Sequence, residues 1–209
     1  LSGLFGRLSK RLEKHPGVDV CWDGLVEVSE EELTSLSPAT RVLGCNASMN
    51  VYENRPITVD PTLYRKRSSG GHIHFGIQNP ELMAERREMV YACDIIIGNT
   101  CVLFDRDPGA AERRENYGRA GEYRLPKHGL EYRTVSNFWL RSPKLMRIVF
   151  DLAHIAYEIS FQSFNGNQPL WNALADRVNI ADIRRAIDTN DAKLALKNLK
   201  RLLPFLRKQ

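Results

Sequence analysis

Two acid–base pairs lie close together in the stretch GEYRLPKHGLEYR, residues 121–133. Each has the pattern Glu-x-Arg, with a tyrosine between acid and base: Glu122 with Arg124, and Glu131 with Arg133. Arginine presents a planar fork of donors that suits phosphate and carboxylate oxygens. Carboxylate oxygens can take part in holding a divalent cation. These residue types therefore indicate a site for a phosphate group next to a cation.

Two histidines extend this set. The stretch RSSGGHIHFGI, residues 67–77, places His72 and His74 two residues apart, behind the paired glycines Gly70 and Gly71, which predict close packing at this point. Alternate residues of a strand share one face, so both imidazoles point the same way. A lone His-x-His is structural in many proteins. Histidines combined with carboxylates and several arginines suit a nucleoside-triphosphate site, and the chain has neither GxxxxGK[ST] nor GxGxxG.

The elements that must position these residues start with a hairpin. A four-residue loop at 126–129 would place Arg124 opposite Glu131 and Glu122 opposite Arg133. The four charges would then share one face with His72, and the apolar residues would pack behind them: Tyr123, Leu125, Leu130, Tyr132. A simpler interpretation is two cross-strand ion pairs on a wet sheet, worth about 0.2–1 kcal/mol each.

The other segments predict mixed secondary structure. Apolar spacing predicts helices over residues 1–15 and 80–93, and Ser29 caps a short helix over 29–33. After Pro143 the pattern is helical, with three further helices. The polar segment 105–121 is expected to be a mobile loop. Strands followed by helices indicate the α+β class.

Composition limits the partners. The 30 Lys and Arg against 25 Asp and Glu give a net charge of +5, which is concentrated after residue 184. A solvated helix face accounts for this tail, so nucleic acid is not an expected partner. No apolar run reaches the roughly 20 residues of a membrane span. Four cysteines without a CxxC pair fit a reducing, cytoplasmic compartment. The start at Leu1, inside an apparent helix, predicts a missing N-terminal portion.

Three stretches carry a family resemblance: RSSGGHIHFGI, then RRENYGRAGEYRLPKHGLEYRTVSNFWL, with LGCNASMNVY ahead of both. Together they resemble the phage-type carboxylate–amine ligases (COOH-NH2 ligase type 2) of the glutamine synthetase and glutamate–cysteine ligase superfamily. The resemblance covers residues 43–140. It implies a glutamine synthetase-like catalytic domain over residues 1–209, with a curved antiparallel sheet, helices outside it, and a helical part over 143–209.

The resemblance also implies roles for the histidines and for one carboxylate. His72 resembles a magnesium ligand, and His74 resembles a residue that lines the nucleotide side of the same strand. Glu131 resembles the strand carboxylate that shares the metal with the histidine. The family's early acidic motif is not found in residues 1–42, so we expect the metal site to be incomplete within this chain.

The arginines complete the implied site. Arg119 and Arg124 resemble the arginines that surround the nucleotide phosphates and the transferred phosphoryl group. Arg133 resembles the arginine that stabilises the acyl phosphate or the substrate carboxylate. Arg113 and Arg114 match the family's RRxxYG pattern, but the resemblance gives them no role.

The implied activity is an ATP- and Mg²⁺-dependent ligation of a carboxylate to an amine. ATP would convert the carboxylate to an acyl phosphate, from which the amine displaces phosphate. The substrates would be small molecules or peptides, in the host bacterium's cytoplasm if a phage encodes the chain. Two alternatives stay open: a metal-dependent hydrolase that uses the His-x-His pair with Glu131, and a non-catalytic binding protein with a degenerate ligase fold.

Overall fold

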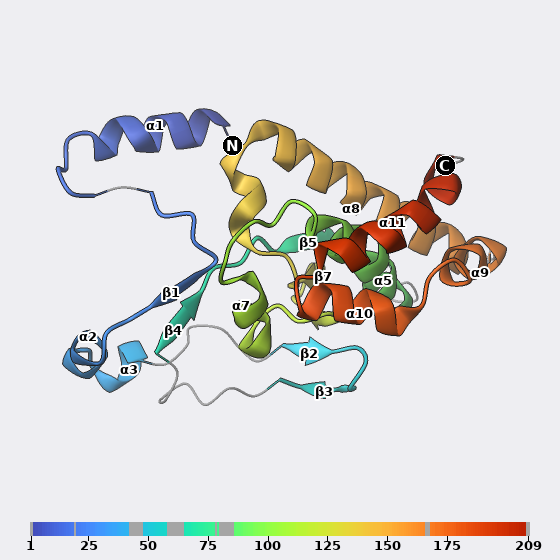
Figure 1. Ribbon diagram of the computed structural model, residues 1–209, viewed down its shortest axis with the longest axis horizontal. Helices are drawn as coiled ribbons and strands as arrows, with labels where there is room; N and C mark the ends of the chain where they lie inside the picture. The colour runs from blue at the N-terminus through green and yellow to red at the C-terminus, as the bar shows by residue number, and fades with distance from the viewer. Residues whose placement is uncertain are drawn as a thin grey trace.

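The structure is a computed structural model that describes residues 2–18, 20–41, 48–57, 65–77, 79, 86–165 and 168–207. The first part of the helix predicted over 80–93 lies outside the described residues, as do residues 43–47 of the stretch LGCNASMNVY. The remaining segments form antiparallel sheets and helices, which confirms the α+β class (Figure 1).

The strands of the described residues form two sheets, and every pair is antiparallel. A small sheet pairs β1 (Leu25–Glu27) with β4 (Lys66–Ser68). The larger sheet has the order β3-β2-β6-β7-β5. Its strands are β2 (Met49–Asn50), β3 (Arg55–Pro56), β5 (Ile73–Gly76), β6 (Glu122–Arg124) and β7 (Gly129–Tyr132).

Helices account for most of the remaining described residues. The N-terminal helices are α1 (Ser2–Leu12), α2 (Glu30–Ser35) and α3 (Pro38–Arg41). The central ones are α5 (Arg86–Cys93), the π-helix η1 (Asp94–Gly98), α6 (Asn99–Cys101), α7 (Ala110–Asn116) and the 3₁₀-helix η2 (Asn137–Arg141). The C-terminal ones are α8 (Pro143–Phe164), α9 (Gln168–Ala175), α10 (Ile180–Asp188) and α11 (Ala192–Leu206). None of those within the described ranges has both the length and the hydrophobicity that a membrane-spanning helix requires.

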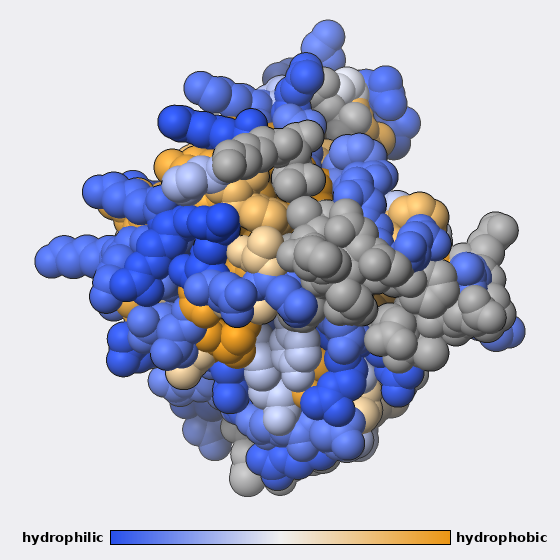
Figure 2. Space-filling view, turned by 90° about the vertical axis from the view of Figure 1, so that its right-hand side faces the viewer, coloured by the Kyte–Doolittle hydropathy of each residue, from blue (hydrophilic) through white to orange (hydrophobic). Residues whose placement is uncertain are grey.

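The core lies between the larger sheet and the helices. Strand alternation turns Ile73 and Phe75 of β5, and Leu130 and Tyr132 of β7, into the buried apolar cluster. Figure 1 shows α5, α8, α10 and α11 grouped beside this sheet, with β1, β4, α2 and α3 at the other end of the molecule. On the face of the molecule shown in Figure 2, hydrophobic areas are interrupted by hydrophilic side chains. The sheet therefore has one face buried under helices, which leaves the opposite face for polar residues.

Two local predictions are wrong. The segment expected to be a mobile loop contains α7, and its residues Arg113 and Arg114 are buried. Polarity suggested solvent exposure, but carbonyl and amide oxygens from distant segments accept hydrogen bonds from these guanidinium groups. Leu125 does not pack behind the charges, because β6 ends at Arg124 and Leu125 is 46% exposed.

Candidate active site

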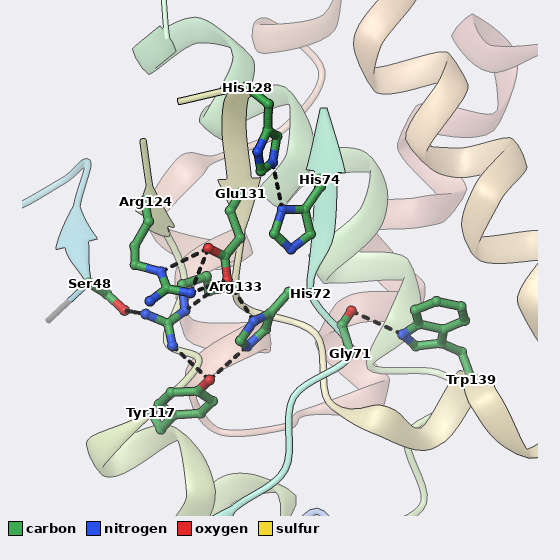
Figure 3. Close-up of polar contacts among 10 residues, drawn as sticks. All are labelled: Ser48, Gly71, His72, His74, Tyr117, Arg124, His128, Glu131, Arg133 and Trp139. Carbon is green, nitrogen blue, oxygen red and sulfur yellow. Dashed lines mark hydrogen bonds and ion pairs between the residues drawn. The ribbon is translucent and has the colours of Figure 1, made fainter. Parts of the chain in front are cut away.

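Strand register brings the charged residues together on one sheet face. Arg124 of β6 and His74 of β5 are both paired with Glu131, from opposite sides of β7. The backbone N–H of Arg133 donates to the carbonyl of Glu122 at 3.0 Å, so this second predicted pair is also opposed. The predicted hairpin is therefore confirmed, with Glu131 at the centre of the charged face (Figure 3).

Glu131 is the buried residue at the centre of this cluster. Arg124 donates to both carboxylate oxygens, from Nε at 2.8 Å and from Nη2 at 2.8 Å. His72 Nδ1 lies 2.7 Å from Oε1, and Arg133 Nε lies 3.6 Å from the same oxygen. Only 2% of the Glu131 side chain is exposed, against 28% for Arg124 and 17% for His72. Arg124 and His72 are therefore more open to solvent than the carboxylate they contact.

Tyr117 links Arg133 to His72. Its hydroxyl accepts a hydrogen bond from Arg133 Nη2 at 2.8 Å and lies 2.7 Å from His72 Nε2. The Glu131 carboxylate can only accept, so His72 Nδ1 carries the proton. Nε2 of the neutral ring then accepts from the Tyr117 hydroxyl. A single chain of hydrogen bonds follows, running from Arg133 through Tyr117 and His72 to Glu131 (Figure 3).

Burial and the arginines fix the charge states of this chain. Burial, together with the charge of Arg133, lowers the pKa of His72 to about 4, although Glu131 opposes the shift. Burial is the largest single influence on Glu131 and by itself would raise the pKa, but the hydrogen bonds from Arg124 and the charges of His72, Arg124 and Arg133 together outweigh it, and the pKa is lowered. At neutral pH, His72 is therefore uncharged and Glu131 is ionised. Two guanidinium groups face one carboxylate, so the cluster carries a net positive charge.

Two glycines allow His72 to reach this position. A Cβ at Gly70 would lie 2.2 Å from Nε2 of His72. A Cβ at Gly71 would lie 2.2 Å from Nε1 of Trp139 and 2.3 Å from the carbonyl oxygen of Ser136. The Gly71 carbonyl instead accepts a hydrogen bond from Trp139 Nε1 at 3.1 Å (Figure 3). The chain entering β5 therefore packs directly against η2, as the paired glycines indicated.

Arg113 and Arg114 hold helix α7 in place. Arg113 donates from Nε to the carbonyl of Ser69 at 2.8 Å, and its guanidinium lies over the ring of Tyr117. Arg114 donates from Nη1 to Oδ1 of Asn190 at 2.6 Å, in the turn between α10 and α11. These two side chains fix α7 against the segment before β5 and against the C-terminal helices. They thereby hold Tyr117, which directly follows α7.

Other expected site residues do not belong to the cluster around Glu131. The Arg119 guanidinium donates to the carbonyls of Arg114 and Glu115 at the end of α7, so the structure does not bring it to Glu131. His74 shares the face of Glu131 but is exposed, and its Nδ1 lies 3.0 Å from Nε2 of His128. Their nucleotide-binding roles stay predictions. Buried Glu122 accepts from the backbone N–H of Arg119 at 3.0 Å.

The cluster does not fit a magnesium ion in this arrangement. Magnesium requires oxygen ligands in near-octahedral geometry and usually has one or two carboxylates. Here both oxygens of Glu131 accept hydrogen bonds from Arg124, and both nitrogens of His72 are engaged. Among the described residues, no group of three or more His, Cys, Asp or Glu could hold a metal ion. The assignment of His72 and Glu131 as metal ligands stays a prediction.

Sequence reasoning missed two members of the cluster. Tyr117 lies within RRENYG, and Ser48, which accepts from Arg133 Nη1 at 2.9 Å, lies within LGCNASMNVY. Both positions fall in stretches that carry the family resemblance. That resemblance was the available signal, since neither residue type by itself indicates a site.

The fold and the site define an α+β protein with a basic cluster around one carboxylate on an antiparallel sheet. The family model for the phage phiEco32-like COOH.NH2 ligase-type 2 proteins matches residues 37–168, which include every residue of this cluster. The chain therefore belongs to this family of carboxylate–amine ligases. Comparison with curated proteins found no match, and comparison with solved structures found none.

Proposed function

We propose that this chain is an ATP-dependent ligase that joins a carboxylate to an amine through an acyl phosphate. The observation that carries the proposal is the cluster of Arg124, Arg133 and Glu131 within the family-matched segment. A carboxylate does not react with an amine at neutral pH, because it has no adequate leaving group. Phosphorylation by ATP supplies one, and the amine then displaces phosphate.

The basic cluster suits the first step of this reaction. An anionic carboxylate must approach the anionic γ-phosphate of ATP, so positive charge must offset the repulsion. Arg124 is partly exposed and would contact the phosphoryl group directly. Arg133 is 1% exposed and would add its charge from beneath, held by Tyr117 and Ser48. Beyond this charge, the protein would contribute to the first step by positioning the two substrates.

In this proposal magnesium arrives bound to the phosphates of ATP. Magnesium commonly binds through substrate phosphates with few protein ligands. Once bound, it would offset phosphate charge during transfer. Arg124 and His74, which both lie beside Glu131 on the same face of the sheet, would contact this complex of nucleotide and magnesium.

The substrates we propose are a small-molecule or peptide carboxylate and an amine, taken up by one catalytic domain over residues 1–209. A cytoplasmic location is consistent with the use of ATP. It is also supported by the cysteines of the described residues: Cys21, Cys93 and Cys101 are all free thiols.

Product analysis over a panel of amino acids and short peptides tests this proposal. ADP and phosphate should form only when acid, amine and ATP are all present. Hydroxylamine should replace the amine and trap the acyl phosphate as a hydroxamate. Turnover without ATP, abolished by a chelator and restored by Zn²⁺, would instead establish the hydrolase alternative.

ATP binding can be measured without knowing the acid or the amine. ATP with Mg²⁺ should raise the thermal unfolding midpoint, because a ligand that binds only the folded state stabilises it. Arg124→Ala should remove most of this shift, whereas Arg106→Ala, at an exposed position outside the cluster, should preserve it. An unchanged midpoint at millimolar ATP would contradict the proposed nucleotide site.

One observation favours a second candidate, a non-catalytic binding protein. Arg124 and His72 already engage the carboxylate of Glu131, and the described residues hold no three-ligand metal cluster. Such a protein would bind ATP or a carboxylate without turnover. A thermal shift with ATP, combined with no ADP formation across the panel, would support this second candidate.

A further inference from the structure

Two exposed histidines meet at the edge of the charged sheet face. His74 Nδ1 and His128 Nε2 lie 3.0 Å apart, and the ring centroids are 5.2 Å apart. Figure 3 shows the two rings turned toward each other, beside Glu131. His74 comes from β5, while His128 comes from the loop between β6 and β7. This pairing depends on tertiary structure, because the two residues are 54 positions apart.

The backbone holds both residues in place. His74 is paired with Glu131 in the ladder between β5 and β7. The carbonyl of His128 accepts a hydrogen bond from the N–H of Ile77 at 3.0 Å, directly beyond β5. Gly129 has a φ of 143° and approaches so closely that a Cβ there would lie 2.1 Å from the carbonyl oxygen of Phe75. The two imidazoles are therefore brought together by the main chain before any ligand binds.

Two imidazole nitrogens this close can act as a chelate. Metal–nitrogen bonds of about 2.1 Å to two atoms 3.0 Å apart subtend an angle of about 90° at the metal. That angle suits adjacent positions of a square-planar or octahedral ion, and imidazole prefers Ni²⁺, Cu²⁺ and Zn²⁺ to Mg²⁺. One ring must move its proton to its other nitrogen, and both rings must rotate so that the two lone pairs converge on the ion instead of facing each other along the hydrogen bond.

We propose that His74 and His128 form a two-histidine site for a transition-metal dication, separate from any magnesium that accompanies ATP. The exposed rings leave the remaining coordination positions to water. Because His74 is the cross-strand neighbour of Glu131, a bound ion lies beside the basic cluster. The proposal depends only on the two rings and the backbone that holds them, so it is independent of ligase activity.

Calorimetric titration of the complete chain with NiCl₂, in a buffer that does not bind metals, tests the site. Wild-type protein should bind one Ni²⁺. His74→Ala and His128→Ala should each weaken binding by at least the roughly 10–100-fold that loss of a ligand-supporting group costs. The matched controls are His15→Ala and His154→Ala, two exposed histidines elsewhere in the chain, and both should bind like wild type. MgCl₂ should give no binding that depends on His74 or His128.

Two results would overturn this assignment. One is Ni²⁺ affinity unchanged in either His74→Ala or His128→Ala while thermal unfolding shows both variants folded. The other is loss of binding in His72→Ala with full retention in His128→Ala, which would place the ion at Glu131 instead. A glutamine variant, His128→Gln, guards against a structural effect, since it preserves polarity in the loop but should also lose the ion.

Discussion

At the scale of single residues, Glu131 and Tyr117 organise the charged face. Glu131 gathers Arg124, Arg133 and His72 around one buried carboxylate. Tyr117 closes the arrangement by joining His72 to Arg133 through one hydroxyl. A cluster that positions its guanidinium groups in advance needs little reorganisation when a phosphate arrives, which is the usual basis of electrostatic catalysis.

Removing the Tyr117 hydroxyl should loosen this cluster. Tyr117→Phe retains the ring beneath Arg113 but breaks the link between Arg133 and His72. We expect a loss of about 1–3 kcal/mol in the free energy of unfolding, as for other buried hydrogen bonds that lose one partner. Urea denaturation measures it. Tyr157→Phe on α8 is the control and should change stability by no more than about 0.5 kcal/mol; equal losses in the two variants would contradict the structural link.

Removing the charge of Glu131 should affect the reaction strongly. Glu131→Gln retains the side-chain size but leaves Arg124, Arg133 and His72 without their shared anion. By analogy with other phosphoryl-transfer sites, we expect a loss of roughly 10³-fold in ligation rate, and Arg133→Ala should lose at least as much. Glu115→Gln, at an exposed position on α7, should retain wild-type turnover. Ligation by Glu131→Gln at a near wild-type rate would show that Glu131 has no essential part.

At the scale of elements, the site depends on how β5 enters the sheet. The approach of Gly71 to Trp139 and Ser136 fixes the strand against η2. From there the ladder with β7 places His74 opposite Glu131, and His72, directly before β5, contacts the same carboxylate. The segment that positions the histidines is therefore fixed at its N-terminal end by packing and along its length by hydrogen bonds.

An alanine scan of two glycines tests this fixation. Gly71→Ala would place a methyl group 2.3 Å from the carbonyl of Ser136, and backbone cannot move aside cheaply. We expect it to destabilise the protein by about 1–3 kcal/mol, the usual cost of overpacking. The control is Gly76→Ala, at the last residue of β5, where a Cβ would meet no atom of the described residues within 4 Å. The thermal unfolding midpoint should therefore be lower for Gly71→Ala than for Gly76→Ala. Similar midpoints would argue against the close contact.

At the scale of the whole molecule, Asp94 joins the helices to the sheet. It lies in the π-helix η1, fully buried, and accepts hydrogen bonds from the hydroxyls of Tyr52 and Tyr132, each at 2.7 Å. Burial raises the pKa of Asp94 to about 7, although the two tyrosine hydroxyls oppose the shift. π-Helical turns recur at functional sites, and this one places a carboxylate against the back of strand β7.

The raised pKa of Asp94 predicts a pH dependence of stability. Between pH 4 and pH 7 the folded state binds the Asp94 proton more tightly than the unfolded state, so its contribution to stability falls as pH rises. His72 has a lowered pKa and contributes the opposite slope, which is why a difference measurement is required. The free energy of unfolding of Asp94→Asn, relative to wild type, should therefore increase steadily from pH 4 to pH 7. A constant difference across this range would contradict the raised pKa.

The sequence by itself determined the features that depend on local pattern. Alternation in GEYRLPKHGLEYR and the short loop within it set the hairpin and the pairing of Arg124 with Glu131. The paired glycines indicated close packing before His72, and apolar spacing after Pro143 predicted the C-terminal helices. Each of these follows from residues near one another in the chain, whose backbone geometry restricts what they can form.

Only the tertiary structure decided which distant groups complete the site. Tyr117 reaches His72 across 45 positions, and Ser48 reaches Arg133 across 85. The burial of Arg113 depends on a carbonyl 44 positions away, which no local pattern encodes, so its segment was mistaken for a loop. Polar residues carry no periodic signal for burial, because their environment is favourable only when a distant partner satisfies them. The sequence could therefore name the charged residues, whereas the folded chain determined which of them are enclosed and which remain open to a ligand.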